Sequence, residues 1–136
     1  MALDRHSADW YAALDEYVRA RHGLPFAWGS HDCCTFAADW VQTVRGNDPM
    51  QGLRGLSTAS NALRTINALG GLKNAVTARM GEAVAGTLAQ VGDVALVRHG
   101  GDRLSIGVCL GAHIAAPGLT GLLMLPITQA EAAWRV

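Results

Sequence analysis

Apolar side chains recur at three- and four-residue spacing along the first 80 residues, which is the period of helices that lie on a core. Polar cap residues and glycines divide this stretch into four predicted helices. The first runs from Ser7 to a stop at Gly23, the second covers Cys33 to Arg45 behind the cap residue Asp32, the third runs from Ser57 or Thr58 to Leu69, and the fourth from Leu72 to Met80. On the second helix, the spacing places Phe36, Trp40 and Val44 on one inward face.

After Gln90 the spacing changes to the two-residue alternation of strands. The predicted strands are Asp93 to Val97, Leu104 to Leu110, His113 to Ala116 and Leu122 to Leu125, with turns at His99 to Asp102 and around Pro117-Gly118. Thr128 is predicted to cap a last helical turn before Trp134-Arg135-Val136. The connections are short, so the strands should be antiparallel. Helices followed by strands predict an α+β fold, and the length predicts a single domain over residues 1–136.

The amino-acid composition argues against several classes of protein, namely disordered, nucleic-acid-binding and membrane-spanning chains. Half of the residues are hydrophobic and 16% are charged, which excludes a disordered chain. Eleven basic residues balance eleven acidic ones with no basic stripe, so we expect no nucleic-acid binding. The apolar run from Leu119 to Ile127 is too short to span a membrane, and no apolar segment of a signal peptide follows Met1, so we expect synthesis in the cytoplasm. The low charge hints at a surface covered by partners, although a GC-rich genome explains it equally well.

The densest candidate chemistry lies between Phe26 and Phe36, where Cys33 occupies the first turn of the predicted second helix. The helix dipole and the unpaired backbone N–H groups of a first turn favour the thiolate. The same N–H groups can hold an oxyanion. The competing interpretation is a small buried cysteine beside a cap. The chain has three cysteines, two of them adjacent, which form no disulfide framework, and Cys109 is expected to pack in the core.

Three motifs extend this picture. The run Trp28-Gly29-x-x-Asp32-Cys33-x-x-Phe36, the segment Val91 to Val97 with its Gly-Asp pair, and the segment Leu104 to Gly111 occur in that order. Together they resemble the NlpC-type branch of the papain-like cell-wall cysteine peptidases, over residues 26–118. The resemblance implies a papain-like fold, with N-terminal helices packed on a small antiparallel sheet and Cys33 at the position of the nucleophile.

The resemblance places the catalytic histidine of that family at Ser105 and its third polar residue near Ala115. Serine cannot act as the imidazole base that activates a thiol. His113, which shares a strand face with Ala115, is the best replacement base, whereas His31 and His99 are expected in surface loops. We predict no cofactor. We predict no metal either, because His31, Cys33 and Cys34 lack the spacing of a zinc site.

A second resemblance spans nearly the whole chain. Asp32 to Val41, Gly70 to Leu72, Gly92 to Val94 and Leu125 to Val136 look like a small prophage protein family, similar in type to NlpC-like proteins encoded among phage tail genes. It implies a virion component at the tail tip of a phage or gene-transfer agent, assembled in the host cytoplasm. The implied partners are other tail-tip or hub proteins, with peptidoglycan as a further candidate.

Three hypotheses follow from the sequence. The first is a tail-tip or tail-assembly protein whose peptidase-like site is degenerate. The second is an active cysteine amidase or endopeptidase that cuts peptidoglycan during DNA entry, with Cys33 as nucleophile. The third, a free-standing intracellular binding module, is supported only by the fold.

Overall fold

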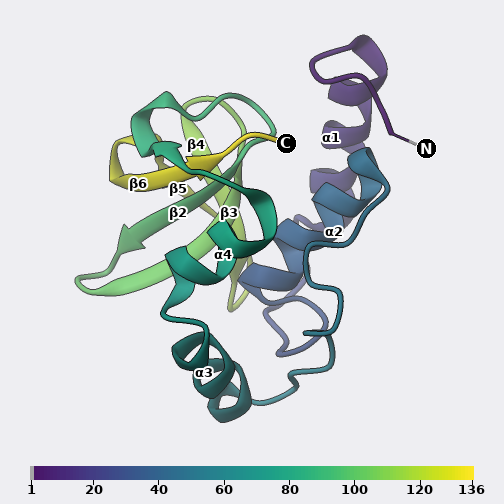
Figure 1. Ribbon diagram of the computed structural model, residues 1–136. Helices are drawn as coiled ribbons and strands as arrows, with labels where there is room; N and C mark the ends of the chain where they lie inside the picture. The colour runs from purple at the N-terminus through teal and green to yellow at the C-terminus, as the bar shows by residue number, and fades with distance from the viewer. Residues whose placement is uncertain (1) are drawn as a thin grey trace.

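The computed structural model describes residues 2–136 and has an α+β architecture (Figure 1). Helices α1 (Ala8–Arg21) and α2 (Cys33–Arg45) pack together, and α2 lies against the antiparallel sheet, chiefly on β3 and also on β4. Two shorter helices, α3 (Ala59–Ala68) and α4 (Leu72–Met80), follow after a long loop. Figure 1 shows α4 close to the sheet and α3 at the far end of the molecule from the N-terminus. The predicted fold class is therefore confirmed at this level.

The helix ends follow the predicted caps. Ser7 accepts a hydrogen bond from the Trp10 amide at 3.2 Å, and Asp32 accepts one from the Thr35 amide at 2.8 Å. Gly46 ends α2 in the left-handed conformation, with φ of 81°. Thr58, rather than Ser57, caps α3. Each cap satisfies backbone groups that the helix itself leaves unpaired, which explains why these boundaries can be predicted from sequence.

The sheet has six strands in the order β1-β6-β2-β3-β4-β5, all pairs antiparallel. The strands are β1 (Val84–Ala85), β2 (Val94–His99), β3 (Arg103–Cys109), β4 (His113–Gly118), β5 (Gly121–Pro126) and β6 (Ala130–Trp134). Strands β2 to β5 follow one another as neighbours, and β6 returns to pair with β2 on its other edge.

Three parts of the sheet were not predicted: the short strand β1, the strand β6 and the position of the turn between β4 and β5. Strand β6 has the sequence Ala-Glu-Ala-Ala-Trp, which lacks β-branched residues and favours a helix by propensity. It forms a strand because β2 offers a free edge, on which Ala132 and Ala133 pair with Leu96 and Ala95. The turn expected around Pro117-Gly118 was also misplaced, since β4 continues to Gly118 and reverses before Gly121.

The core lies between α1, α2 and one face of the sheet. Phe36, Trp40 and Val44 pack there against Val94, Leu96, Ile106 and Val108, as predicted. The Trp10 and Trp40 rings meet edge to face, 5.4 Å apart, and Trp40 Nε1 donates a hydrogen bond to the Gly92 carbonyl at 2.8 Å. A Cβ at Gly92 would lie 1.8 Å from a ring carbon of Trp10, so only glycine allows this packing.

Asp93 is fully buried directly after Gly92 and ties the two ends of the described chain together. Its carboxylate forms ion pairs with Arg5 at 2.8 Å and with Arg135 at 2.6 Å. It also accepts hydrogen bonds from the backbone amides of Gln90 and Val136. All of its acceptor positions are therefore used in holding the structure, which is how a buried carboxylate is tolerated. Within residues 2–136, no helix is long and apolar enough to cross a membrane.

Candidate functional site

The candidate site begins at the first turn of α2, where the loop before the helix is fixed by Asp32. One carboxylate oxygen of Asp32 accepts the Gly29 amide at 2.8 Å, and the other accepts the Thr35 amide at 2.8 Å. The Asp32 side chain is buried, and its role is to fix the loop and the helix start. This geometry presents Cys33 and Cys34 as the first two residues of α2, both half-buried.

The pKa values of the two adjacent thiols are shifted in opposite directions. A hydrogen bond from the Cys34 side chain lowers the pKa of Cys33, and the backbone of Ile106 adds to this, whereas burial opposes it. The same hydrogen bond raises the pKa of Cys34 well above its usual range, and burial raises it further. The pair therefore favours a thiolate on Cys33 and a protonated donor on Cys34, as expected of a first-turn cysteine.

Ser105 directly precedes the residue of β3 that the Cys33 thiol meets, and strand alternation turns its side chain toward the face opposite α2. Along β3, Ile106 and Val108 point to the face that α2 covers, so Ser105 between Leu104 and Ile106 points to the other face. Ser105 pairs with Val97, which belongs to the core cluster on that second face. The residue of β3 that meets Cys33 is Ile106, through its backbone.

His99 lies on the same face as Ser105, where its Nε2 is 2.8 Å from the Ser105 Oγ. The sequence placed His99 in a hairpin turn, but it is the last residue of β2 and is half-buried. The contact could have been predicted from the two-residue alternation of β2 and β3, because residues placed diagonally across an antiparallel pair lie on the same face. A polar pair therefore exists on the face of the sheet opposite α2.

The other two candidate histidines, His31 and His113, differ in their surroundings. His113, the predicted replacement base, is exposed at the start of β4, opposite Pro126. His31 is 8% exposed, packs edge to face against Phe36, and its buried Nε2 has no hydrogen-bond partner. Burial, with a smaller contribution from Arg21, lowers the pKa of His31 below 6.5. His31 was expected on the surface, and only the packing of the loop onto α2 buries it.

The remaining candidate positions are apolar. Ala115, at the position of the third polar residue, is fully buried in the core that α2 covers. Cys109 is also fully buried, on the second face of the sheet, and burial raises its pKa. Cys109 thus packs in the core, as the sequence analysis expected. Among residues 2–136, no three His, Cys, Asp or Glu side chains gather into a metal-ligand set.

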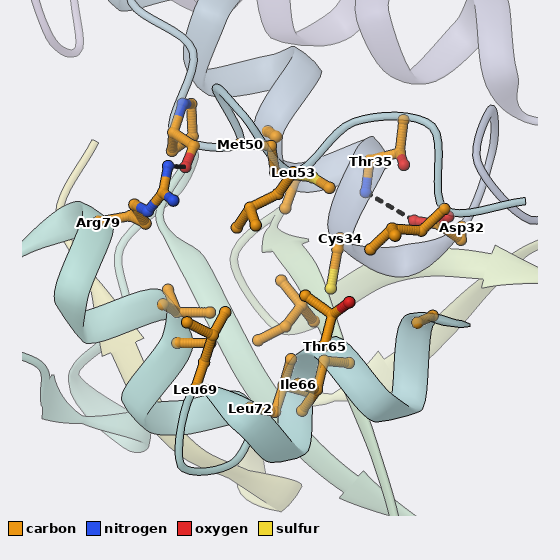
Figure 2. A pocket seen from close by; sticks show the side chains of 18 of the residues that line it. Asp32, Cys34, Thr35, Met50, Leu53, Thr65, Ile66, Leu69, Leu72 and Arg79 are labelled. Carbon is orange, nitrogen blue, oxygen red and sulfur yellow. Dashed lines mark hydrogen bonds between the residues drawn. The ribbon is translucent and has the colours of Figure 1, made fainter. Parts of the chain in front are cut away.

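An apolar cavity of about 100 Å³ lies beside the thiols and was not predicted. Figure 2 shows the Cys34 side chain projecting from α2 into this cavity. Its walls are formed by residues of α2 and the turn before it, of the loop before α3, of α3 and α4, and of strands β2 and β3. They include Asp32, Cys34, Thr35, Ala38, Met50, Leu53, Leu56, Thr65, Ile66, Leu69, Leu72, Ala75, Val76, Arg79, Met80, Val94 and Ile106. The cavity could not be predicted from the sequence, because the apolar residues of each wall have the spacing of an ordinary core-facing side of one helix.

Comparison with known proteins gives a family without an assigned activity. No curated protein matches the chain. The sequence model of one family, described as a domain of unknown function (DUF6950), matches residues 5–136. Nearly all of the chain is covered by that match, so the chain belongs to this family of domains of unknown function.

Proposed function

We propose that this chain is an NlpC-type, papain-like domain without peptidase activity, which serves as a structural component of the tail tip of a phage or gene-transfer agent. Helices that precede an antiparallel sheet, and a cysteine in the first turn of the helix on that sheet, support the papain-like part. The tail-tip part is supported by the resemblance of residues 32–136 to a prophage protein family.

The observation that carries the loss of activity is the position of Ser105. It occupies the histidine position of the resemblance, is not an imidazole, and points to the face opposite α2. A lowered thiol pKa supplies a nucleophile, but protonation of the leaving amine in peptide cleavage needs a positioned acid. Cys34 offers a protonated thiol, whose raised pKa makes it a weak acid.

Thiol labelling combined with a cleavage assay tests this half of the proposal. Iodoacetamide at neutral pH should alkylate Cys33 before Cys34 and Cys109, with a rate that rises toward pH 8. The same protein should release no fragments from purified peptidoglycan. Release of fragments by the native chain, lost in Cys33→Ala, would overturn the loss of activity.

The tail-tip role needs a different measurement. Immunogold labelling of assembled tails should place the protein at the tip, and tails that carry Cys33→Ala should assemble and infect normally. Deletion of the gene should block assembly or infection, which is the matched control. Absence of label from purified tails would overturn this part.

An active cysteine amidase or endopeptidase is the second candidate, and one observation favours it. His31 is two residues before Cys33 and has a buried Nε2 without a hydrogen-bond partner, so an imidazole with an unused nitrogen lies in the loop that leads to the nucleophile position. Cleavage of peptidoglycan that is lost in His31→Ala would establish this candidate. Cleavage lost instead in His113→Ala would identify the base that the sequence suggested.

A further inference from the structure

We propose that the cavity between α2, α3 and α4 binds a short aliphatic carboxylate, with its chain beside Cys34 and its carboxylate at Arg79. This inference is independent of the proposed function, because it requires neither cleavage by Cys33 nor assembly into a tail. It rests on the lining, the volume and the charges of the cavity.

The lining excludes a polar ligand from the interior. The walls are mostly aliphatic side chains and methionines, and the labelled polar groups are the Cys34 thiol, the Thr35 and Thr65 side chains, and the charged groups of Asp32 and Arg79 (Figure 2). A buried water needs two to four polar partners, which such walls supply poorly. Leu53, Ile66 and Leu72 stay only half-buried although they point inward. An apolar group in the cavity would complete their burial.

The volume sets the length of that group. A cavity of about 100 Å³ is smaller than the engineered cavity of about 150 Å³ that holds benzene, and it has space for roughly three to five methylene groups if each occupies about the volume of one water molecule. A chain of roughly six carbons, including the carboxylate carbon outside, therefore fits, and a long acyl chain does not.

The charges at the cavity set the head group. Arg79 Nη1 donates to the Gln51 carbonyl at 2.7 Å and to the Pro49 carbonyl at 3.4 Å, and Arg79 forms no ion pair within residues 2–136. Asp48, on the same loop, is bound by Arg54 at 2.9 Å. Asp32, the acidic residue of the lining, has both oxygens occupied by backbone amides. An arginine without a carboxylate partner beside an apolar cavity favours an anionic head group.

Hexanoate, 1-hexanol and hexylamine are the probes that test this inference. Iodoacetamide alkylates a thiolate by forming a carbon–sulfur bond and expelling iodide, so alkylation is followed above neutral pH, where the Cys34 thiol reacts in spite of its raised pKa. Peptide mass spectrometry separates Cys34 from Cys33 and Cys109. Hexanoate should slow alkylation of Cys34 in a saturable manner. It should act at concentrations about fivefold lower than 1-hexanol, which is the ratio that one partly exposed ion pair supplies. Hexylamine should be the weakest of the three.

Two variants assign the parts of the site. Ala75→Leu fills the cavity from α4 and should abolish protection by all three probes, whereas Ala78→Leu, on the exposed side of α4, should not. Arg79→Gln should remove the advantage of hexanoate and keep binding of 1-hexanol. The inference is overturned if hexanoate gives no protection in the native chain, if hexylamine equals hexanoate, or if Ala75→Leu changes nothing. The comparison of hexanoate with hexylamine decides the charge even if Arg79→Gln does not fold.

Discussion

The two sides of α2 differ in how completely they are packed. Toward α1 and the sheet, Phe36, Trp40 and Val44 are at most 1% exposed. Toward α3 and α4, the helix presents Cys34, Thr35 and Ala38 to a cavity, covered by side chains that remain half-buried. Large residues on one side of the helix thus secure the fold, and small residues on the other side leave space. Tight packing and open space are thus separated across a single helix.

Removing Trp40 should produce the largest effect, because its ring is fully buried and its Nε1 is hydrogen-bonded to Gly92. Trp40→Ala should lower the free energy of unfolding by about 3–5 kcal/mol, as measured by urea denaturation. Trp28, which is 43% exposed, is the matched control, and Trp28→Ala should cost less than about 1 kcal/mol. Similar losses in the two variants would show that Trp40 contributes no more to stability than an exposed tryptophan.

Asp93→Asn should have the next largest effect. The change keeps the shape of the side chain but removes the charge that holds Arg5 and Arg135, both of which retain partial access to water. We expect a loss of about 2 kcal/mol, the range for hydrogen bonds to charged groups. Asp102→Asn, at a fully exposed residue in the β2–β3 turn, should change stability by less than about 0.5 kcal/mol. An Asp93→Asn protein as stable as the native chain would show that the two arginines contribute only packing.

Much of the packed side was predictable from the sequence, and the open side was not. The caps Ser7 and Asp32 act within one turn, and the spacing of Phe36 and Trp40 reports the face of a single helix, so local patterns suffice. The face of Ser105 depends on the register of β3, which a motif match does not contain. The cavity depends on how three helices and a loop meet, so its walls look like ordinary core positions in the sequence.

Ile66→Ala in α3 should cost only about 1 kcal/mol, since Ile66 is half-buried and already borders the cavity. Truncation there enlarges an existing space instead of creating one in a filled core, so the transfer of a few methylene groups dominates. Urea denaturation of Ile66→Ala and Trp40→Ala under the same conditions measures the ratio of the two losses in unfolding free energy. A loss above about 3 kcal/mol would mean that α3 is packed as tightly as the sheet side.

His31 predicts a small dependence of stability on pH. Burial lowers the pKa of His31 in the folded protein below its ordinary value of 6.5, so the unfolded chain takes up the proton first as the pH falls. The contribution of His31 is therefore constant above about pH 7 and becomes destabilising as the pH falls through 6.5. His31→Phe should flatten the stability curve in this window when thermal unfolding is followed from pH 8 to pH 5. An unchanged slope would show that the ring is reached by water.

Ser105→His should have the smallest effect of all, although it restores the residue type of the NlpC-type motif. The new imidazole would point to the face of Val97 and His99, while Cys33 lies on the α2 side of β3, so we expect no thiol–imidazole pair to form. Alkylation of Cys33 should keep its rate within about twofold, peptidoglycan should stay intact, and unfolding should shift by less than about 0.5 kcal/mol. The double variant Ser105→His, Cys33→Ala is the control for the cleavage assay, because it measures any cleavage that does not depend on Cys33. Cleavage in the single variant that is lost in the double variant would show that β3 can turn its other face toward α2, and that one substitution separates this domain from an active peptidase.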